Sequence, residues 1–239
     1  MKAGFRAVAL DMPSFGRSSG VHAYLPDLLL NAEAIEAVMQ HVRFLDERDG
    51  MPGARQRKAF GQGSSMGGFT VLYHAALYPP VSPVSLGGPG QTDRASFSGL
   101  AVSAPMLQIS PQSRPNAFVE FCANVISALG GGRLPLARAI KGNVSDDPKV
   151  EYYAQLDPQV YHGLVRVATG LAVVMGLEHL QLLIPQIRCP VALHHGANDR
   201  VTSPEGTRRF FERLQVEPKA FRMWPGVEHG ESNCRGAAH

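Results

Sequence analysis

The feature that most constrains this chain is a G-x-S-x-G motif centred on Ser65. The motif lies where a short apolar strand predicted at 57–62 gives way to an apolar helix predicted at 67–78. A serine on a tight strand-to-helix turn needs small residues two places before and two places after it, because the two backbones cross there. Gly63 and Gly67 meet this demand. We therefore predict that Ser65 is the nucleophile of a nucleophile elbow.

Two other interpretations of the serines are weaker. Choosing Ser64 as the nucleophile would place Gln62 and Met66 at the two small positions. A second G-x-S-x-G match, at 16–20, has no strand directly before it and no helix directly after it. We interpret the second match as a loop. A turn serine without chemistry stays the alternative for Ser65.

Short apolar runs alternate with helical patterns along most of the chain. The predicted strands lie at 5–11, 57–62, 99–104, 190–195 and 220–224, and the predicted helices between them at 26–45, 67–78 and 207–214. This alternation is typical of parallel sheets that are covered on both faces. The fold class is therefore predicted as α/β, with a mostly parallel sheet and flanking helices. A stretch rich in Pro, Gly and Ser at 79–96 is predicted to be a mobile surface loop.

The alternation of strands and helices stops in the middle of the chain. Residues 106–185 are predicted to be wholly helical, with main segments at 117–129, 134–140 and 164–183. About 80 residues are too many for an ordinary connection between two strands. We predict one α/β domain, formed by 1–105 and 186–239, with a helical insertion at 106–185.

Two later residues are suited to activate the serine. A serine hydroxyl becomes a good nucleophile when a base removes its proton and an acid fixes the tautomer of that base. In one arrangement of such triads the chain order is serine, acid, histidine. Asp199 follows the predicted strand at 190–195, and His229 follows the predicted strand at 220–224. This order predicts Asp199 as the orienting acid and His229 as the general base.

Each of these residues also has a plainer interpretation. An Asp in a loop with Gly and Asn is often a turn former, and His229 is one of nine histidines. His194 and His195 lie inside or at the end of a strand, and we expect them to pack or to anchor the loop. Glu228 is a competing acid, but adjacent side chains do not readily pair in the required way.

Composition argues against several other classes of function. The formal net charge of +3 is small, and the densest basic group, at 55–58, is expected to be a solvated turn and not a nucleic-acid surface. The three cysteines, Cys122, Cys189 and Cys234, show no metal-ligand spacing, and their odd number excludes a full disulfide framework. The apolar run 167–177 is far shorter than the roughly 20 residues that span a bilayer. No targeting segment is recognised, so a cytoplasmic location is expected.

Four segments together match one known family. Residues 63–68 read G-S-S-M-G-G, where that family has G-H-S-M-G-G, and 11–20 follow its D-x-x-G-x-G-x-S-x-G segment with Ser14 in place of the first Gly. Residues 98–105 look like its strand after the elbow helix, and 187–199 look like its acid strand. The chain thus resembles the monoacylglycerol lipase and lysophospholipase group of α/β hydrolases, of the serine aminopeptidase S33 type.

The resemblance implies both a fold and an activity. It implies an α/β-hydrolase fold and a serine hydrolase that cleaves a monoacylglycerol or a lysophospholipid through an acyl-enzyme, without a metal or an organic cofactor. Ser65, Asp199 and His229 would be catalytic, and the backbone N–H of Met66 would hold part of the oxyanion. The insertion at 106–185 would be a cap over the acyl pocket, and peripheral membrane contact through this cap is left open.

The chain departs from the family at one point. The family has an H-G motif after an earlier strand, and its loop supplies the second donor of the oxyanion hole; this chain starts too late to contain it. Loss of one such donor costs on the order of 10²–10³ in rate. We therefore expect a fold that lacks its N-terminal strands. An impaired or non-catalytic protein of this fold is the alternative to a lipase, and a hydrolase of small peptides or non-lipid esters is a third hypothesis.

Overall fold

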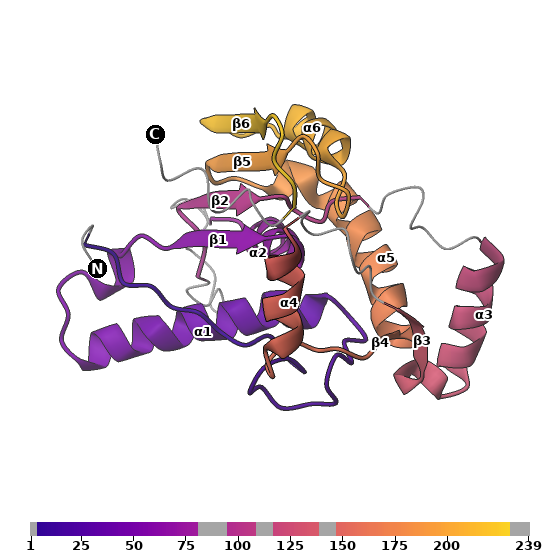
Figure 1. Cartoon of the computed structure of the whole chain (residues 1–239). Coiled ribbons are helices and arrows are strands. Elements are labelled where there is room, and N and C mark those ends of the chain that lie inside the picture. The colour runs from indigo at the N-terminus through magenta and orange to yellow at the C-terminus, as the bar shows by residue number, and fades with distance from the viewer. Residues whose placement is uncertain (1–3, 81–94, 109–116, 139–146, 230–239) are drawn as a thin grey trace.

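The computed structural model describes residues 4–80, 95–108, 117–138 and 147–229 (Figure 1). Its main sheet has four parallel strands in the order β1-β2-β5-β6. These strands are β1 (Phe60–Ser64), β2 (Gly99–Ser103), β5 (Val191–Gly196) and β6 (Lys219–Trp224). All four were predicted to within a few residues at each end, and the parallel pairing confirms the predicted α/β class.

The helices between these strands also follow the prediction. They are α1 (Leu29–Arg48), α2 (Met66–Leu77) and α6 (Pro204–Arg213), with short 3₁₀ turns η1 (Ala54–Gln56) and η4 (Ile184–Gln186). α6 begins three residues before the predicted start, at Pro204. The Ser203 side chain accepts a hydrogen bond from the Gly206 N–H (3.0 Å) and so caps the first turn. A proline fits the first helical position because its missing N–H would have no partner there.

One face of the main sheet is packed, and the other is open among the described residues. Val102 and Leu193 lie side by side on the packed face and are fully buried. On this face α2 places Gly68 against Val102, and α6 reaches His195 through Thr207. The opposite face exposes Gln62, Ala101, Ala220 and Arg222. We expected helices to cover both faces of the sheet. The described helices cover one face, because α2 and α6 lie on the same side of the sheet.

The segment predicted as the first strand, 5–11, belongs to no sheet. Phe5 meets Phe60 edge-on at 6.1 Å, and Arg6 forms an ion pair of 2.8 Å with Asp46 near the end of α1. The prediction of a buried strand is wrong here. A strand needs a neighbour that offers free backbone groups, and the described residues place none beside this segment. Phe5 is accordingly 62% exposed.

The insertion is not wholly helical. It contains α3 (Ala117–Ala128), η3 (Gly131–Arg133), β3 (Pro135–Arg138), α4 (Pro148–Leu156), β4 (Leu164–Arg166) and α5 (Val167–Leu183). β3 and β4 form an antiparallel pair. The predicted helix at 134–140 is therefore wrong, and the helix predicted from 164 begins at Val167. The surface loop expected at 79–96 lies mostly outside the described residues.

Two side chains fasten the insertion to the loop before α1. Arg166 donates from Nε to the carbonyl oxygen of His22 at 2.9 Å. The Thr169 hydroxyl accepts from the Leu25 N–H at 2.9 Å and donates to the Ala23 carbonyl at 2.8 Å, in a buried setting. The insertion is thus hydrogen-bonded to the rest of the protein at its second half. Its boundaries at 106 and 185 stay a prediction.

α5 contributes to the main hydrophobic core. Leu177 and Leu180 of α5 are buried in one cluster with Ile184 of η4 and Phe69 of α2. The stretch Val167–Gln186 is nevertheless long and apolar enough to cross a membrane, with a mean hydropathy of 1.7. The apolar run was predicted to end at 177, too short to span a bilayer, and that prediction is wrong in length. Leu177 and Leu180 of this helix pack into the core, whereas Met175 and Leu182 of the same helix are exposed.

Candidate active site

Ser65 occupies the sharp turn between β1 and α2. Its backbone has φ 54° and ψ −121°, which lies outside the regions that non-glycine residues prefer. The turn is held by its own peptide groups. The Ser65 N–H donates to the Ser103 carbonyl (3.1 Å), while the Ser65 carbonyl accepts from the N–H groups of Met106 (3.0 Å) and Phe69 (3.0 Å). The predicted strand–serine–helix context is therefore present.

The two glycines of the motif differ in whether the structure leaves room for a side chain. A Cβ at Gly63 would lie 2.3 Å from the carbonyl oxygen of Gly67 and 2.8 Å from the nitrogen of Gly68. Both contacts are with backbone that cannot move aside. A Cβ at Gly67 would have nothing within 4 Å. The close approach of β1 and α2 thus requires glycine at 63, and the described contacts do not require it at 67.

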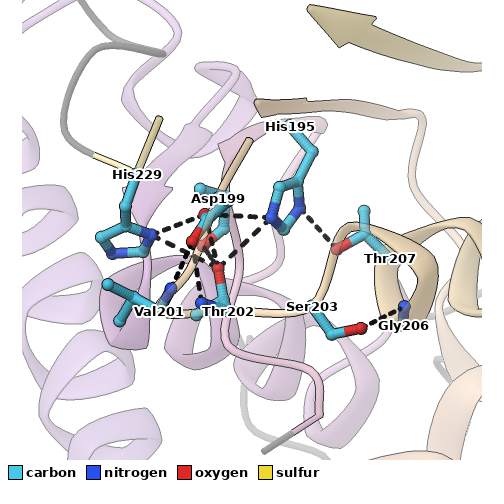
Figure 2. A network of polar contacts seen from close by, with 9 residues as sticks. His195, Asp199, Val201, Thr202, Ser203, Gly206, Thr207 and His229 are labelled. Atoms are coloured by element: carbon cyan, nitrogen blue, oxygen red, sulfur yellow. Dashed lines mark hydrogen bonds and ion pairs between the residues drawn. The ribbon is translucent and has the colours of Figure 1, made fainter. Parts of the chain in front are cut away.

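Asp199 lies in the loop between β5 and α6 and has no exposed side-chain surface. Its Oδ1 accepts hydrogen bonds from the N–H groups of Val201 (2.8 Å) and Thr202 (2.9 Å). Its Oδ2 accepts from the Thr202 hydroxyl (2.9 Å), from Nε2 of His195 (3.1 Å) and from Nδ1 of His229 (2.7 Å), as Figure 2 shows. Five donors therefore surround one carboxylate.

These donors decide the charge of Asp199. Burial alone would raise the pKa of its carboxyl group, because a buried charge loses hydration. Hydrogen bonds from His195 and His229 outweigh burial and hold the pKa well below its ordinary value of 3.8. Asp199 is thus an anion at neutral pH, as an orienting acid must be.

His229 reaches Asp199 because two loops run side by side. Ala197 donates its N–H to the Trp224 carbonyl (2.9 Å), and Asn198 donates to the Val227 carbonyl (3.0 Å). Further along the same two loops, the Arg200 guanidinium forms an ion pair with the Glu228 carboxylate at 2.7 Å. Glu228, the competing acid, thus faces an arginine.

The structure brings Asp199 and His229 together and places Ser65 at the same edge of the sheet. Ser65 follows β1 and donates its N–H to the carbonyl of Ser103 at the end of β2. The carbonyl oxygen of the next residue, Ala104, lies 3.3 Å from the hydroxyl oxygen of Thr202. The Ser65 hydroxyl itself makes no hydrogen bond within the described residues. Such contacts are often long in a free enzyme and shorten when substrate binds. The role of Ser65 as nucleophile therefore stays a prediction.

Met66 is the first residue of α2. The first N–H groups of a helix have no partner within the helix, and they point toward its N-terminal end. The Met66 N–H is thus available near the Ser65 side chain, where an oxyanion would form. Its role in an oxyanion hole stays a prediction.

Three residues of this network were not predicted as part of the site: His195, Thr202 and Thr207. His195 was expected to pack or to anchor the loop, and its bond to Asp199 confirms the anchoring. The signal in the sequence was its spacing, four residues before the acid. His194 points to the opposite face of the sheet and stacks on Trp224, with ring centroids 6.3 Å apart.

The remaining predictions concern metals and thiols. Within the described part of the chain, no group of three or more His, Cys, Asp or Glu side chains is arranged to hold a metal ion. Cys122 and Cys189 are free thiols, and burial raises the pKa of Cys189 to about 11. Cys189 is therefore protonated, and a poor nucleophile, at neutral pH. Cys234 lies outside the described residues.

Comparison with known proteins adds a family to this geometry. The family model described as "Serine aminopeptidase, S33" matches residues 1–233. A caffeoylshikimate esterase of Arabidopsis thaliana is 26% identical over 95% of this chain and 62% of its own length. A monoacylglycerol lipase of Mycolicibacterium smegmatis is 26% identical over 95% of this chain and 72% of its own length. The chain thus spans less than two thirds of the esterase.

Solved structures show the same fold. The crystal structure of Paleococcus ferrophilus monoacylglycerol lipase superposes with a TM-score of 0.72 at 24% identity, over 94% of this chain and 78% of that chain. A soluble variant of monoglyceride lipase from Saccharomyces cerevisiae, in complex with a substrate analog, superposes with a TM-score of 0.69 at 17% identity. The match covers 92% of this chain and 68% of that chain. At these identities the likeness establishes the α/β-hydrolase arrangement of the chain.

Proposed function

The chain belongs to the serine aminopeptidase S33 family, and we propose that it is a serine hydrolase that cleaves carboxylic esters through an acyl-enzyme. One observation carries the proposal. The buried, ionised Asp199 bonds His229 at 2.7 Å, at the sheet edge where Ser65 sits on its turn. That pairing fixes the imidazole with its Nδ1 protonated, so Nε2 carries no proton in the neutral ring and can accept one as a base.

The proposed reaction has two halves. In the first, the Ser65 hydroxyl attacks the ester carbonyl and His229 takes its proton. The Met66 N–H stabilises the oxyanion, and His229 then gives its proton to the departing alcohol. In the second half, His229 takes a proton from water, which attacks the acyl-enzyme. The carboxylic acid leaves, and Ser65 regains its proton.

The proposed substrate is a monoacylglycerol or a lysophospholipid. One relative named as a monoacylglycerol lipase and one named as a monoglyceride lipase support the first of these two substrates. A relative named as a caffeoylshikimate esterase supports ester cleavage in general. The insertion also exposes large apolar side chains that suit contact with lipid: Val125, Leu129, Leu134, Tyr152, Tyr153, Leu156 and Met175. Membrane contact through the insertion belongs to the same proposal, and the cytoplasmic location stays a prediction.

A second candidate is a protein of this fold without catalytic activity. The observation that favours it is the Ser65 hydroxyl, which makes no hydrogen bond within the described residues.

Labelling with a fluorophosphonate probe decides between the two candidates. The probe reacts with an activated serine whatever the substrate, so we expect the purified chain to be labelled and Ser65→Ala to be unlabelled. A folded chain that stays unlabelled would contradict the hydrolase proposal. Hydrolysis of 2-oleoylglycerol, oleoyl-lysophosphatidylcholine and caffeoyl methyl ester then tests the substrate class. Preference for the caffeoyl ester would contradict the lipid proposal and leave the ester hydrolase standing.

A further inference from the structure

We propose that His195 is a positioning residue of this site: it donates a hydrogen bond from Nε2 to Asp199 and so holds the carboxylate that orients His229. Its catalytic consequence rests on the proposed function, whereas the hydrogen bond can be tested without activity. His195 lies at the end of β5 and has no exposed side-chain surface. Figure 2 shows the two histidines on opposite sides of the carboxylate.

The direction of the His195 bond follows from the charge of its partner. An ionised carboxylate only accepts hydrogen bonds. His195 Nε2 lies 3.1 Å from Oδ2 of Asp199 and must therefore carry a proton to bond it. On the other side of the ring, Nδ1 lies 2.8 Å from the Thr207 hydroxyl. In a neutral imidazole this nitrogen has no proton, so the hydroxyl donates to it and fixes the Nε2–H tautomer.

Thr207 is itself held in place by α6. It lies in the first turn of this helix, where its N–H donates to the Ser203 carbonyl at 3.1 Å. Thr207 is fully buried. A chain of contacts therefore runs from the start of α6 through Thr207 and His195 to Asp199, and ends at His229.

The consequence concerns the orientation of the carboxylate. Two backbone N–H groups hold Oδ1, so rotation of the group moves Oδ2, the oxygen that His229 contacts. His195 holds Oδ2 from the side away from His229, and the Thr202 hydroxyl adds a third donor at 2.9 Å. Without His195 the carboxylate loses one of the contacts that fix its position.

Three substitutions separate positioning from packing. His195→Phe keeps the ring and removes the donor. His195→Gln keeps an N–H near the position of Nε2. His194→Phe changes the neighbouring residue, whose side chain points to the other face of the sheet, and serves as the matched control. We expect His195→Phe to slow fluorophosphonate labelling by roughly 10- to 100-fold, the effect of one hydrogen bond to a charged group. His195→Gln should recover most of the rate, and His194→Phe should label as the parent does.

Thermal unfolding of the same variants supplies the control for packing. If the labelling rate follows the melting temperature across the variants, or if His195→Phe labels at the parent rate, the positioning role is overturned. A Gln variant that is as slow as the Phe variant and equally stable would overturn it as well.

A chain that does not react with the fluorophosphonate would refute the proposed function alone. In that case an NMR measurement still tests the hydrogen bond from His195 to Asp199. Long-range ¹⁵N–¹H correlation of ¹⁵N-histidine protein reports the tautomer of each ring. We expect a proton on Nε2 of His195 and on Nδ1 of His229, and a shift of the His229 Nδ1–H resonance in His195→Phe that His195→Gln reverses. A neutral His195 with its proton on Nδ1 would refute the proposed bond.

Discussion

At the scale of single residues, the site depends on one unfavourable backbone and one crowded carboxylate. Ser65 adopts a positive φ of 54°, a conformation that costs about 1–3 kcal/mol for a residue with a side chain. Its peptide hydrogen bonds to Ser103, Met106 and Phe69 keep it there. This turn places the side chain of Ser65 between the end of β1 and the start of α2.

This strain gives a prediction about stability at Ser65. Glycine adopts a positive φ without the clash of a Cβ, so Ser65→Gly should relieve strain that Ser65→Ala retains. We expect the free energy of unfolding of Ser65→Gly to exceed that of Ser65→Ala by about 1 kcal/mol, after the entropy cost of glycine. Urea denaturation measures the difference, and both variants should fail to react with a fluorophosphonate. An alanine variant as stable as the glycine variant would show that the turn stores no strain.

At the scale of elements, the contact of β1 with α2 sets the position of Ser65. The strand and the helix approach so closely at Gly63 that their backbones touch. This contact and the hydrogen bonds between the loops after β5 and β6 bring three segments to one edge of the sheet. In a parallel sheet the carboxyl ends of all strands lie at that edge, which is where ligands bind.

The two elbow glycines provide a matched pair of substitutions. Gly63→Ala would press a methyl group onto the backbone of Gly67, so it should move α2 and destabilise the protein by about 2 kcal/mol or more. Gly67→Ala meets nothing within 4 Å and lies in a helix, where alanine is the better residue. It should unfold at or above the temperature of the parent. Thermal unfolding of the two variants tests this, and equal losses of stability would contradict it.

At the scale of the whole molecule, two buried carboxylates link stability to pH. Asp199 bonds two histidines, and Glu36 of α1 bonds His74 of α2 at 3.0 Å. Burial opposes the charge of each carboxylate, and the hydrogen bonds outweigh burial, so the pKa of each is lowered from its ordinary value, 3.8 for Asp199 and 4.5 for Glu36. A pKa lowered by folding means that the unfolded chain binds protons more readily than the folded one.

The sign of the pH dependence follows. The two carboxylates stabilise the fold above their ordinary pKa values, and this contribution is lost as the pH falls through about 4.5 toward their lower folded values. Asp199→Asn and Glu36→Gln have no carboxyl group at these positions, so each variant lacks the pH-dependent contribution of that residue. We therefore expect the difference in unfolding free energy between the parent and each variant to shrink between pH 6 and pH 3, in urea titrations at fixed salt. A difference that does not change with pH would contradict the linkage.

From the amino-acid pattern alone we could predict where the four strands of the main sheet and the helices α1, α2 and α6 lie along the chain. The pattern also predicted the turn at Ser65, and Asp199 and His229 as the residues after two later strands. These features are local, or depend only on chain order, so periodicity and motif spacing reveal them. Hydrophobic pattern did not separate a short helix from a short strand, and residues 134–140 were assigned to the wrong one.

Which segments meet in space could not be predicted, because it depends on the folded structure. β3 became a strand because β4, far along the chain, supplies its hydrogen bonds, and 5–11 stayed unpaired because no described strand lies beside it. The contact of His195 with Asp199 and Thr207 likewise depends on how the loop after β5 turns back against α6. A backbone or side-chain hydrogen bond needs its partner within about 3 Å. Folding brings such partners together from distant positions, and no local pattern records that distance.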